Sequence, residues 1–207
     1  MKDWKTPAAK EVIERTLKSL KANGIQAVLV ANAGEARQQV LSMLPAGAEV
    51  FNETSITLET IGLAREINEA GRYDSVRNRL NGLDPKTQER EMRRLGASPD
   101  FAVGSVHAVT EGGTLLIASN TGSQLPAYAY AAGKVIWVVG AQKIVKDVDE
   151  GLRRIREYVL GLESARARKA YGLPDDWNSF YSKILLFNRE VNPNRAHVVL
   201  VNEALGF

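Results

Sequence analysis

Apolar and polar residues follow two different periodicities along this chain, which predicts interleaved strands and helices. Several short apolar runs are rich in β-branched residues and have the length of strands, and near-continuous apolar runs suit strands that are covered on both faces. The main runs are residues 25–31, 101–110, 114–118 and 135–139, with weaker ones at 50–51, 184–187 and 197–201. We expect the four main runs to lie in a single sheet with helices on both faces.

Apolar residues spaced three and four apart predict the helices between these strands. The clearest runs over residues 148–162, after Asp147 and Glu150 at capping-box spacing. The other predicted helices cover 13–20 (ended by Gly24), 33–44 (started by Asn32 with Glu35), 56–67, a charged stretch from Asp84-Pro85 to about Gly96, and 123–132. This alternation is typical of an α/β fold, here a three-layer α/β/α sandwich with a mostly parallel sheet in one domain spanning residues 1–207.

Composition narrows the class of protein. The 207 residues are 44% hydrophobic and 25% charged, as in ordinary globular proteins, and the net charge of +3 is too small to imply a nucleic-acid partner. The chain has no cysteine, which excludes disulfides, thiolate zinc sites, iron–sulfur clusters and cysteine nucleophiles. The longest apolar run falls far short of the roughly 20 residues of a membrane helix, and the charged N-terminus lacks a secretory signal. We therefore expect a cytoplasmic protein without a membrane partner.

One candidate for chemistry is an acidic residue between two predicted strands. Glu111 precedes Gly112, Gly113 and Thr114, so its carboxylate lies on a backbone that a ligand can approach closely. Such a carboxylate could act as a general base or a nucleophile. The alternative is a hairpin turn with an exposed acid.

Three further polar segments follow predicted strands. They comprise Asn52, Thr54 and Ser55; Asn120, Thr121, Gly122 and Ser123; and Lys143. Parallel strands deliver such segments to one edge of the sheet, where ligands bind. We therefore predict a small-anion site with Glu111 exchanging a proton and with Lys143 and helix-start N–H groups holding the charge. The alternatives are ordinary helix caps and a solvated lysine.

Other familiar sites are absent from the sequence. It contains no Walker loop, no G-x-G-x-x-G and no G-x-S-x-G. His107 and His197 fall within predicted strands without metal-ligand spacing, and acidic residues interrupt the basic stretch at 153–169. We expect no metal, no cofactor and no nucleic-acid binding.

Several segments resemble the LUD domain, the lactate-utilisation family. The matching stretches are VGSVHAVTEGGTLL (103–116), NTGSQLPAYAYAAGKVIWVVGAQKIV (120–145), DVDEGLRRI (147–155), SITLETIGL (55–63) and LVNEALGF (200–207). The chain departs from the family pattern at three positions. Many relatives carry Asn where His107 stands, Asp or Thr where Gly112 stands, and a basic residue where Gln124 stands. The resemblance implies a fold similar to the NagB/RpiA/CoA-transferase superfamily and an association with the oxidation of L-lactate to pyruvate.

Three functions stay open. The first is a cluster-free LUD component that binds a small carboxylate or an iron–sulfur partner protein. The second is an independent enzyme on this fold, acting on an acyl, phosphosugar or folate-like anion with Glu111 as its carboxylate. The third is a non-catalytic binding or regulatory module, and assembly into a homo-oligomer is compatible with each.

Overall fold

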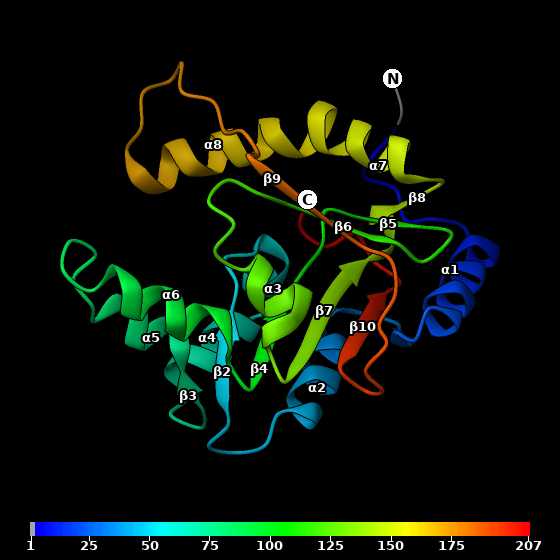
Figure 1. Ribbon diagram of the computed structural model, residues 1–207. Coiled ribbons are helices and arrows are strands. Elements are labelled where there is room, and N and C mark those ends of the chain that lie inside the picture. Colours follow the sequence, from blue (N-terminus) through cyan, green and yellow to red (C-terminus); the bar gives the residue numbers. More distant parts are fainter. Residues whose placement is uncertain (1–2) are drawn as a thin grey trace.

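Six parallel strands form the main sheet of the computed structural model, which describes residues 3–207 (Figure 1). In sheet order these strands are β1 (Gln26–Val30), β10 (Ala196–Val201), β7 (Lys134–Gly140), β4 (Phe101–Gly104), β2 (Glu49–Asn52) and β3 (Asp74–Ser75). Every neighbouring pair is parallel, so all six strands end at the same edge. The α/β class with a mostly parallel sheet is confirmed.

A second, smaller sheet corrects the expectation of a single one. It contains β8 (Ile144–Val145), β5 (Ala108–Thr110), β6 (Leu115–Ser119) and β9 (Lys183–Phe187), in that order. The apolar run 101–110 is therefore two strands in two sheets. The chain leaves the main sheet after Gly104, where the Ser105 hydroxyl donates to the backbone oxygen of Val138, and joins the second sheet where the His107 N–H donates to the oxygen of Leu116.

Helices connect these strands, and those that begin at residues 33, 56 and 148 start where the sequence predicts. Their bounds are α1 Lys10–Ala22, α2 Ala33–Met43, α3 Ile56–Thr60, α4 Leu63–Glu69, α5 Val76–Asn81, α6 Glu89–Ala97, the π-helical turn η1 Ala127–Ala131, the 3₁₀ turn η2 Ala141–Lys143, α7 Val148–Arg154, the π-helical turn η3 Ile155–Val159 and α8 Leu160–Tyr171. Both predicted capping boxes form: Asn32 accepts a hydrogen bond from the Glu35 N–H, and Asp147 accepts one from the Glu150 N–H.

Three predicted helices differ from the structure, and the one expected over 123–132 is reduced to a shorter helical segment that contains η1. The stretch 56–67 is divided into α3 and α4 at Gly62, whose φ of 71° is left-handed. Asp84 does not start a helix, because its carboxylate accepts from the Lys86 N–H and the Thr87 hydroxyl in a separate turn, and α6 begins only at Glu89. No helix within residues 3–207 is both long enough and apolar enough to span a bilayer.

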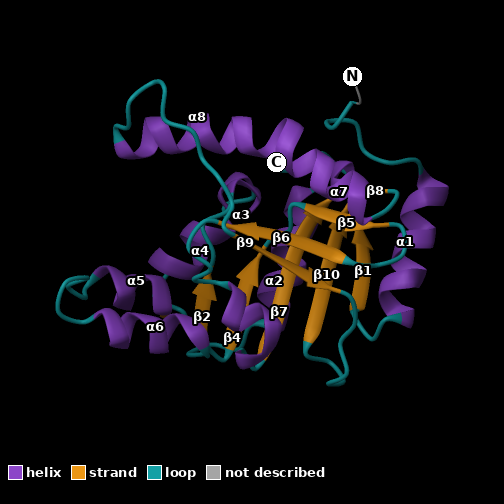
Figure 2. Ribbon diagram, turned by 45° about the horizontal axis from the view of Figure 1, so that its top comes forward, coloured by secondary structure: helices purple, strands orange, loops and turns teal. Residues whose placement is uncertain are grey.

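Three apolar clusters hold the layers together. One face of the main sheet packs against α2, α3 and α4, and the other packs against α1, η1 and the second sheet. The far face of the second sheet packs against the continuous helix α7–η3–α8, which Figure 2 shows crossing above it. Alternate residues of β6 serve two layers: Leu115 and Ile117 face the main sheet, whereas Leu116 and Ala118 face α7 and η3. This double burial explains the unbroken apolar pattern of β6.

Candidate functional site

A cavity of about 270 Å³ lies at the carboxyl edge of the main sheet. The segments that follow β2, β4 and β7 form its inner wall, and the end of β6, α8 and the loop before β9 form the rest. Ligands of open α/β sheets bind outside the carboxyl ends of the strands, so the cavity is where the fold favours a site.

Lys143 is the buried cation of this cavity. It lies on η2 just after β7 and is 1% exposed. Its Nζ atom donates to the hydroxyls of Thr57 and Ser105, both at 3.0 Å. Those hydroxyls are themselves donors, to the backbone oxygens of Leu205 (3.3 Å) and Val138 (2.7 Å), so they can only accept from the lysine. When the amine is protonated, two of its three hydrogens are thus used, and the third has no hydrogen-bond partner among residues 3–207.

Among the described residues, no carboxylate compensates the charge that Lys143 carries when protonated. Burial, helped by the nearby Arg154 guanidinium, holds the pKa of the Lys143 amine well below its usual value. Arg154 is itself fully buried, and its Nε and Nη2 atoms have no hydrogen-bond partner. Burial lowers the pKa of Arg154 to about 10, which still leaves it charged at neutral pH. An anion bound beside Lys143 would favour the protonated amine.

Glu53 brings a neutral acid to the same cavity. This residue follows β2, is 8% exposed, and has no partner for its Oε1 atom. Burial raises the pKa of Glu53 to about 8, with the Arg77 guanidinium acting in the opposite direction. At neutral pH the carboxyl group therefore keeps its proton and can donate it to a ligand.

Tyr128 lies beside Glu53, and its hydroxyl also has no partner. Its position depends on a glycine: a Cβ atom on Gly104 would lie 1.6 Å from the Tyr128 hydroxyl and 3.3 Å from Glu53 Cγ. The missing side chain of Gly104 thus allows the tyrosine to reach the cavity.

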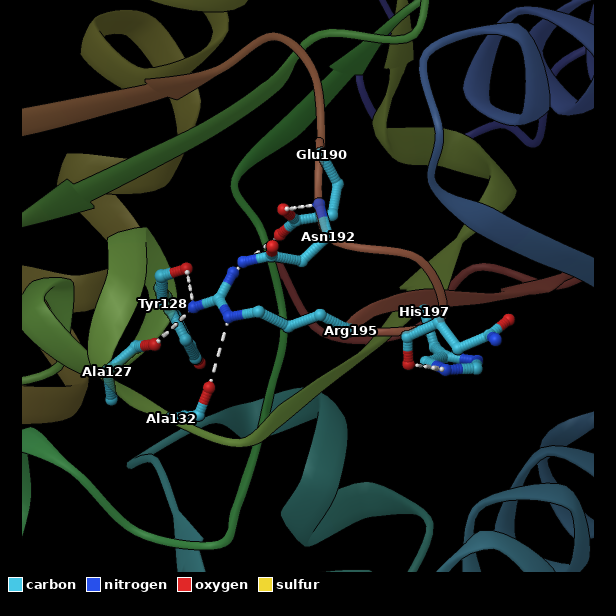
Figure 3. A network of polar contacts seen from close by, with 8 residues as sticks. Ala127, Tyr128, Ala132, Glu190, Asn192, Arg195 and His197 are labelled. Carbon is cyan, nitrogen blue, oxygen red and sulfur yellow. Dashed lines mark hydrogen bonds and ion pairs between the residues drawn. The ribbon is translucent and has the colours of Figure 1, made fainter.

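A buried arginine fixes the helical turn that carries Tyr128 (Figure 3). The Arg195 guanidinium donates to the backbone oxygens of Ala127, Tyr128 and Ala132, each at 3.0 Å. It also forms a buried ion pair with Glu190 at 2.6 Å. Ala127 and Tyr128 are the first two residues of the π-helical turn η1 and Ala132 is its C-cap, so Arg195 ties the start of the turn to its end.

His107 supports the wall of the cavity as a neutral residue. Its Nδ1 atom accepts a hydrogen bond of 3.1 Å from the Ala118 N–H, which leaves any ring proton on Nε2. Burial, with the charges of Lys143 and Arg154, lowers the pKa of His107 to about 3. The imidazole therefore adds no charge at neutral pH.

Comparison with known proteins assigns this architecture to a family. The sequence pattern of the LUD domain matches residues 13–201. The chain belongs to the LUD domain family. A crystal structure of a DUF162 family protein from Deinococcus radiodurans is similar, with a TM-score of 0.58, 15% identity, and coverage of 95% of this chain and 100% of that one. A comparison with curated proteins finds no match. The LUD family associates the chain with lactate utilisation at the level of the family.

The cavity around Lys143, called the LUD cavity from here on, brings together some of the polar residues expected at the site. Its lining includes Thr54, Ser55, Asn120, Thr121, Ser123 and Lys143. Asn52 lies just behind the lining, buried and with its side-chain oxygen unpartnered, while its backbone oxygen accepts from Arg77. Gly122 contributes a turn with a φ of 85° rather than a wall of the cavity. Three of the four expected polar segments therefore do meet.

Glu111 lies away from the anion site in which the sequence pattern placed it. It occupies the hairpin turn between β5 and β6 with Gly112, Gly113 and Thr114, and none of the four lines the LUD cavity. Its carboxylate instead pairs with Arg15 of α1 at 2.7 Å. Strand β6 separates it from Asn120, and five residues at about 3.3 Å each span roughly 16 Å. The two strands are antiparallel, so their connection lies at the opposite end of β6 from the cavity.

Sequence reasoning missed four groups that form the inner wall. Glu53 lies inside the expected polar segment 52–55. The sequence pattern indicated no function for it, because its neighbours Thr54 and Ser55 looked like helix caps. Thr57 lay inside a predicted helix and Ser105 inside a predicted strand, so neither looked available. Tyr128 belongs to a π-helical turn, which often marks a functional site but has no clear sequence signal.

Within residues 3–207, no three His, Asp or Glu side chains are grouped so that they could hold a metal ion. The polar groups that the cavity offers to a ligand include the Lys143 amine, the Glu53 carboxyl group and several hydroxyls.

Proposed function

We propose that this LUD-domain protein binds a small carboxylate, of the size class of lactate and pyruvate, in the cavity beside Lys143. The observation that carries the proposal is the buried amine of Lys143, which two hydroxyls hold in place and which forms no ion pair with a carboxylate of residues 3–207. In this role the protein takes part in cytoplasmic lactate utilisation, and an iron–sulfur partner protein carries the electrons of the oxidation of L-lactate to pyruvate.

The energetics favour an anionic ligand. An unpaired buried charge is costly, and a ligand carboxylate would accept the free N–H of Lys143 in a charge-assisted hydrogen bond. Glu53 does not compete for that position, because its carboxyl group stays protonated at neutral pH. The same protonated group can donate to the hydroxyl or keto oxygen that lies next to the carboxylate in lactate or pyruvate.

Calorimetric titration with L-lactate and with pyruvate tests the proposal. Lys143→Met keeps the length of the side chain and removes the charge, so we expect the dissociation constant to rise at least roughly tenfold. Lys146→Met is the matched control, since Lys146 is exposed and does not line the cavity. The absence of binding to the wild-type protein, or equal binding by the Lys143 variant, would overturn the proposal.

A second candidate function is an enzyme that transfers a proton, on a fold shared with enzymes that act on acyl, phosphosugar or folate-like anions. Glu53 favours it, because a cavity carboxyl group with a pKa of about 8 can both give and accept a proton near neutral pH. In the reaction, Glu53 gives its proton to a carbonyl oxygen, and the resulting carboxylate takes one from the neighbouring carbon to leave an enol.

Deuterium exchange separates this enzyme from a binding module. In D₂O, NMR of pyruvate would show exchange of its methyl hydrogens in the presence of the wild-type protein. Glu53→Gln would abolish the exchange while preserving pyruvate affinity. Exchange no faster than in buffer would leave binding as the only role of the cavity towards pyruvate.

A further inference from the structure

Two aromatic side chains stand at the outer part of the cavity. Tyr171, at the end of α8, is 65% exposed, and Phe180, in the loop before β9, is 59% exposed, yet both line the cavity. We call this pair the aromatic rim. The rim contrasts with the inner wall, where Lys143 and Glu53 are almost completely buried.

Hydrogen bonds to backbone groups hold the loop that carries Phe180 against α8 and the end of β6. The Ser179 N–H donates to the Ser164 hydroxyl of α8 at 2.9 Å, and the Asn120 side chain donates to the Phe180 oxygen at 3.1 Å. On the helix side, the Arg168 guanidinium donates to the Trp177 oxygen at 2.7 Å. Figure 1 shows α8 and the following segment above the carboxyl ends of the main strands. The loop is thus tied both to the helix and to the end of β6, so its exposed ring is presented at a defined place.

The size of the cavity exceeds what lactate requires. Its volume of about 270 Å³ approaches the lower end of the roughly 300–1,000 Å³ typical of pockets for drug-sized ligands. A molecule as small as lactate that contacts Lys143 leaves the outer part of the cavity and the aromatic rim unfilled. Large exposed aromatic rings beside a polar pocket are a common way to bind the flat apolar part of a ligand.

We propose that, beyond lactate-sized acids, the cavity binds most tightly a carboxylate that carries a flat apolar group at its other end. The carboxylate lies against Lys143, and the flat group stacks on Tyr171 and Phe180. This inference rests on the proposed function, because it uses the same anion position. It adds that lactate itself occupies only the inner half of the site.

Matched probes test the second half of the site. L-lactate and L-3-phenyllactate share the carboxylate and the hydroxyl, and only the second has a ring. We expect phenyllactate to bind the wild-type protein roughly fivefold to tenfold more tightly than lactate, as measured by calorimetric titration. 3-Cyclohexyllactate, equally apolar but without a flat π-face, should bind more weakly than phenyllactate.

Rim variants locate the effect. Tyr171→Ala and Phe180→Ala should remove most of the preference for phenyllactate and leave lactate affinity within about twofold. Both residues are largely exposed, so the variants should fold, and circular dichroism checks this. Tyr130→Ala is the control, since Tyr130 is 83% exposed and lies outside the cavity lining.

The outcomes separate the two proposals. Equal affinity for lactate and phenyllactate, or a preference that survives both rim substitutions, overturns the inference about the rim while the carboxylate site stands. Binding of neither acid overturns both. A preference for phenyllactate that is lost in the rim variants but unaffected by Lys143→Met supports the rim and overturns the anion position.

Discussion

The Nζ atom of Lys143 lies 3.0 Å from the hydroxyl oxygen of Ser105, and this contact joins the segments that follow the neighbouring strands β7 and β4. Because Ser105 gives its own hydrogen to Val138, the contact orients the lysine as a donor and leaves one ammonium hydrogen without a protein partner. Within residues 3–207 this arrangement places Lys143 in no ion pair, as the proposed anion site requires. It leads to the first prediction.

Lys143→Met should not destabilise the ligand-free protein. Replacing a buried charge with an apolar side chain of similar size is often neutral or stabilising, so we expect the free energy of unfolding at pH 7 to stay constant or rise by about 1 kcal/mol. Urea denaturation measures it. A loss above about 2 kcal/mol would show that the lysine is mainly structural.

The pH dependence of Lys143 has a defined sign. Its folded-state pKa is lowered, so between that value and the unfolded pKa the unfolded chain binds the extra proton. The stability of the wild-type protein should therefore rise with pH between these two values relative to Lys143→Met. A bound carboxylate should shrink this difference, because it favours the charged amine.

Glu53 should give the opposite slope at lower pH. Its folded pKa of about 8 lies above the reference value of 4.5, so the native state holds the extra proton between these values. The wild-type protein should accordingly lose stability as pH rises through this window, by on the order of 5 kcal/mol relative to Glu53→Gln. Urea denaturation at a series of pH values measures the difference. Glu14→Gln, at an exposed carboxylate, should follow the wild-type curve.

Arg195→Met should be strongly destabilising. It removes the donors to three backbone oxygens and leaves Glu190 buried without its partner. Breaking a buried pair in this way typically costs about 3–5 kcal/mol. Arg65→Met is the comparison, because the Arg65–Glu69 pair is exposed and should contribute less than about 1 kcal/mol. Equal unfolding midpoints for the two variants would contradict the structural role of Arg195.

Glu111→Gln should leave ligand binding unchanged. Its carboxylate pairs with Arg15 at the surface, at the far end of β6 from the cavity. The loss of this partly exposed pair should cost less than about 1 kcal/mol of stability. Calorimetric titration with pyruvate and urea denaturation check both points. A tenfold loss of pyruvate affinity would contradict this prediction and indicate that Glu111 contributes to the binding site.

The fold was largely predictable because most elements carry local signals. Asn32 and Asp147 cap their helices as their spacing indicates, and the apolar run 135–139 is a central strand. The division into two sheets was not predictable, because residues 101–110 stay apolar on both sides of the break. Burial on two faces gives the same pattern whichever sheet covers a strand.

The site was only half predictable for a similar reason. Polar residues after strands mark the carboxyl edge, and Lys143 was found in this way. Thr57 and Ser105, by contrast, function through contacts between segments distant in sequence, at separations of 86 and 38 residues from Lys143. Glu111 carried a stronger local signal than Glu53, but local signals do not tell which end of an antiparallel strand faces the cavity.

The chain passes from the main sheet to the second sheet between β4 and β5, and this connection forms part of the cavity wall. Ser105 and His107 lie on this crossing, so the cavity wall is shared by two separate hydrogen-bonded sheets. A ligand bound there would contact both sheets and restrain their motion relative to each other. Its binding should slow amide hydrogen exchange in β5 and β6 as well as in β4 and β7, although those strands belong to different sheets.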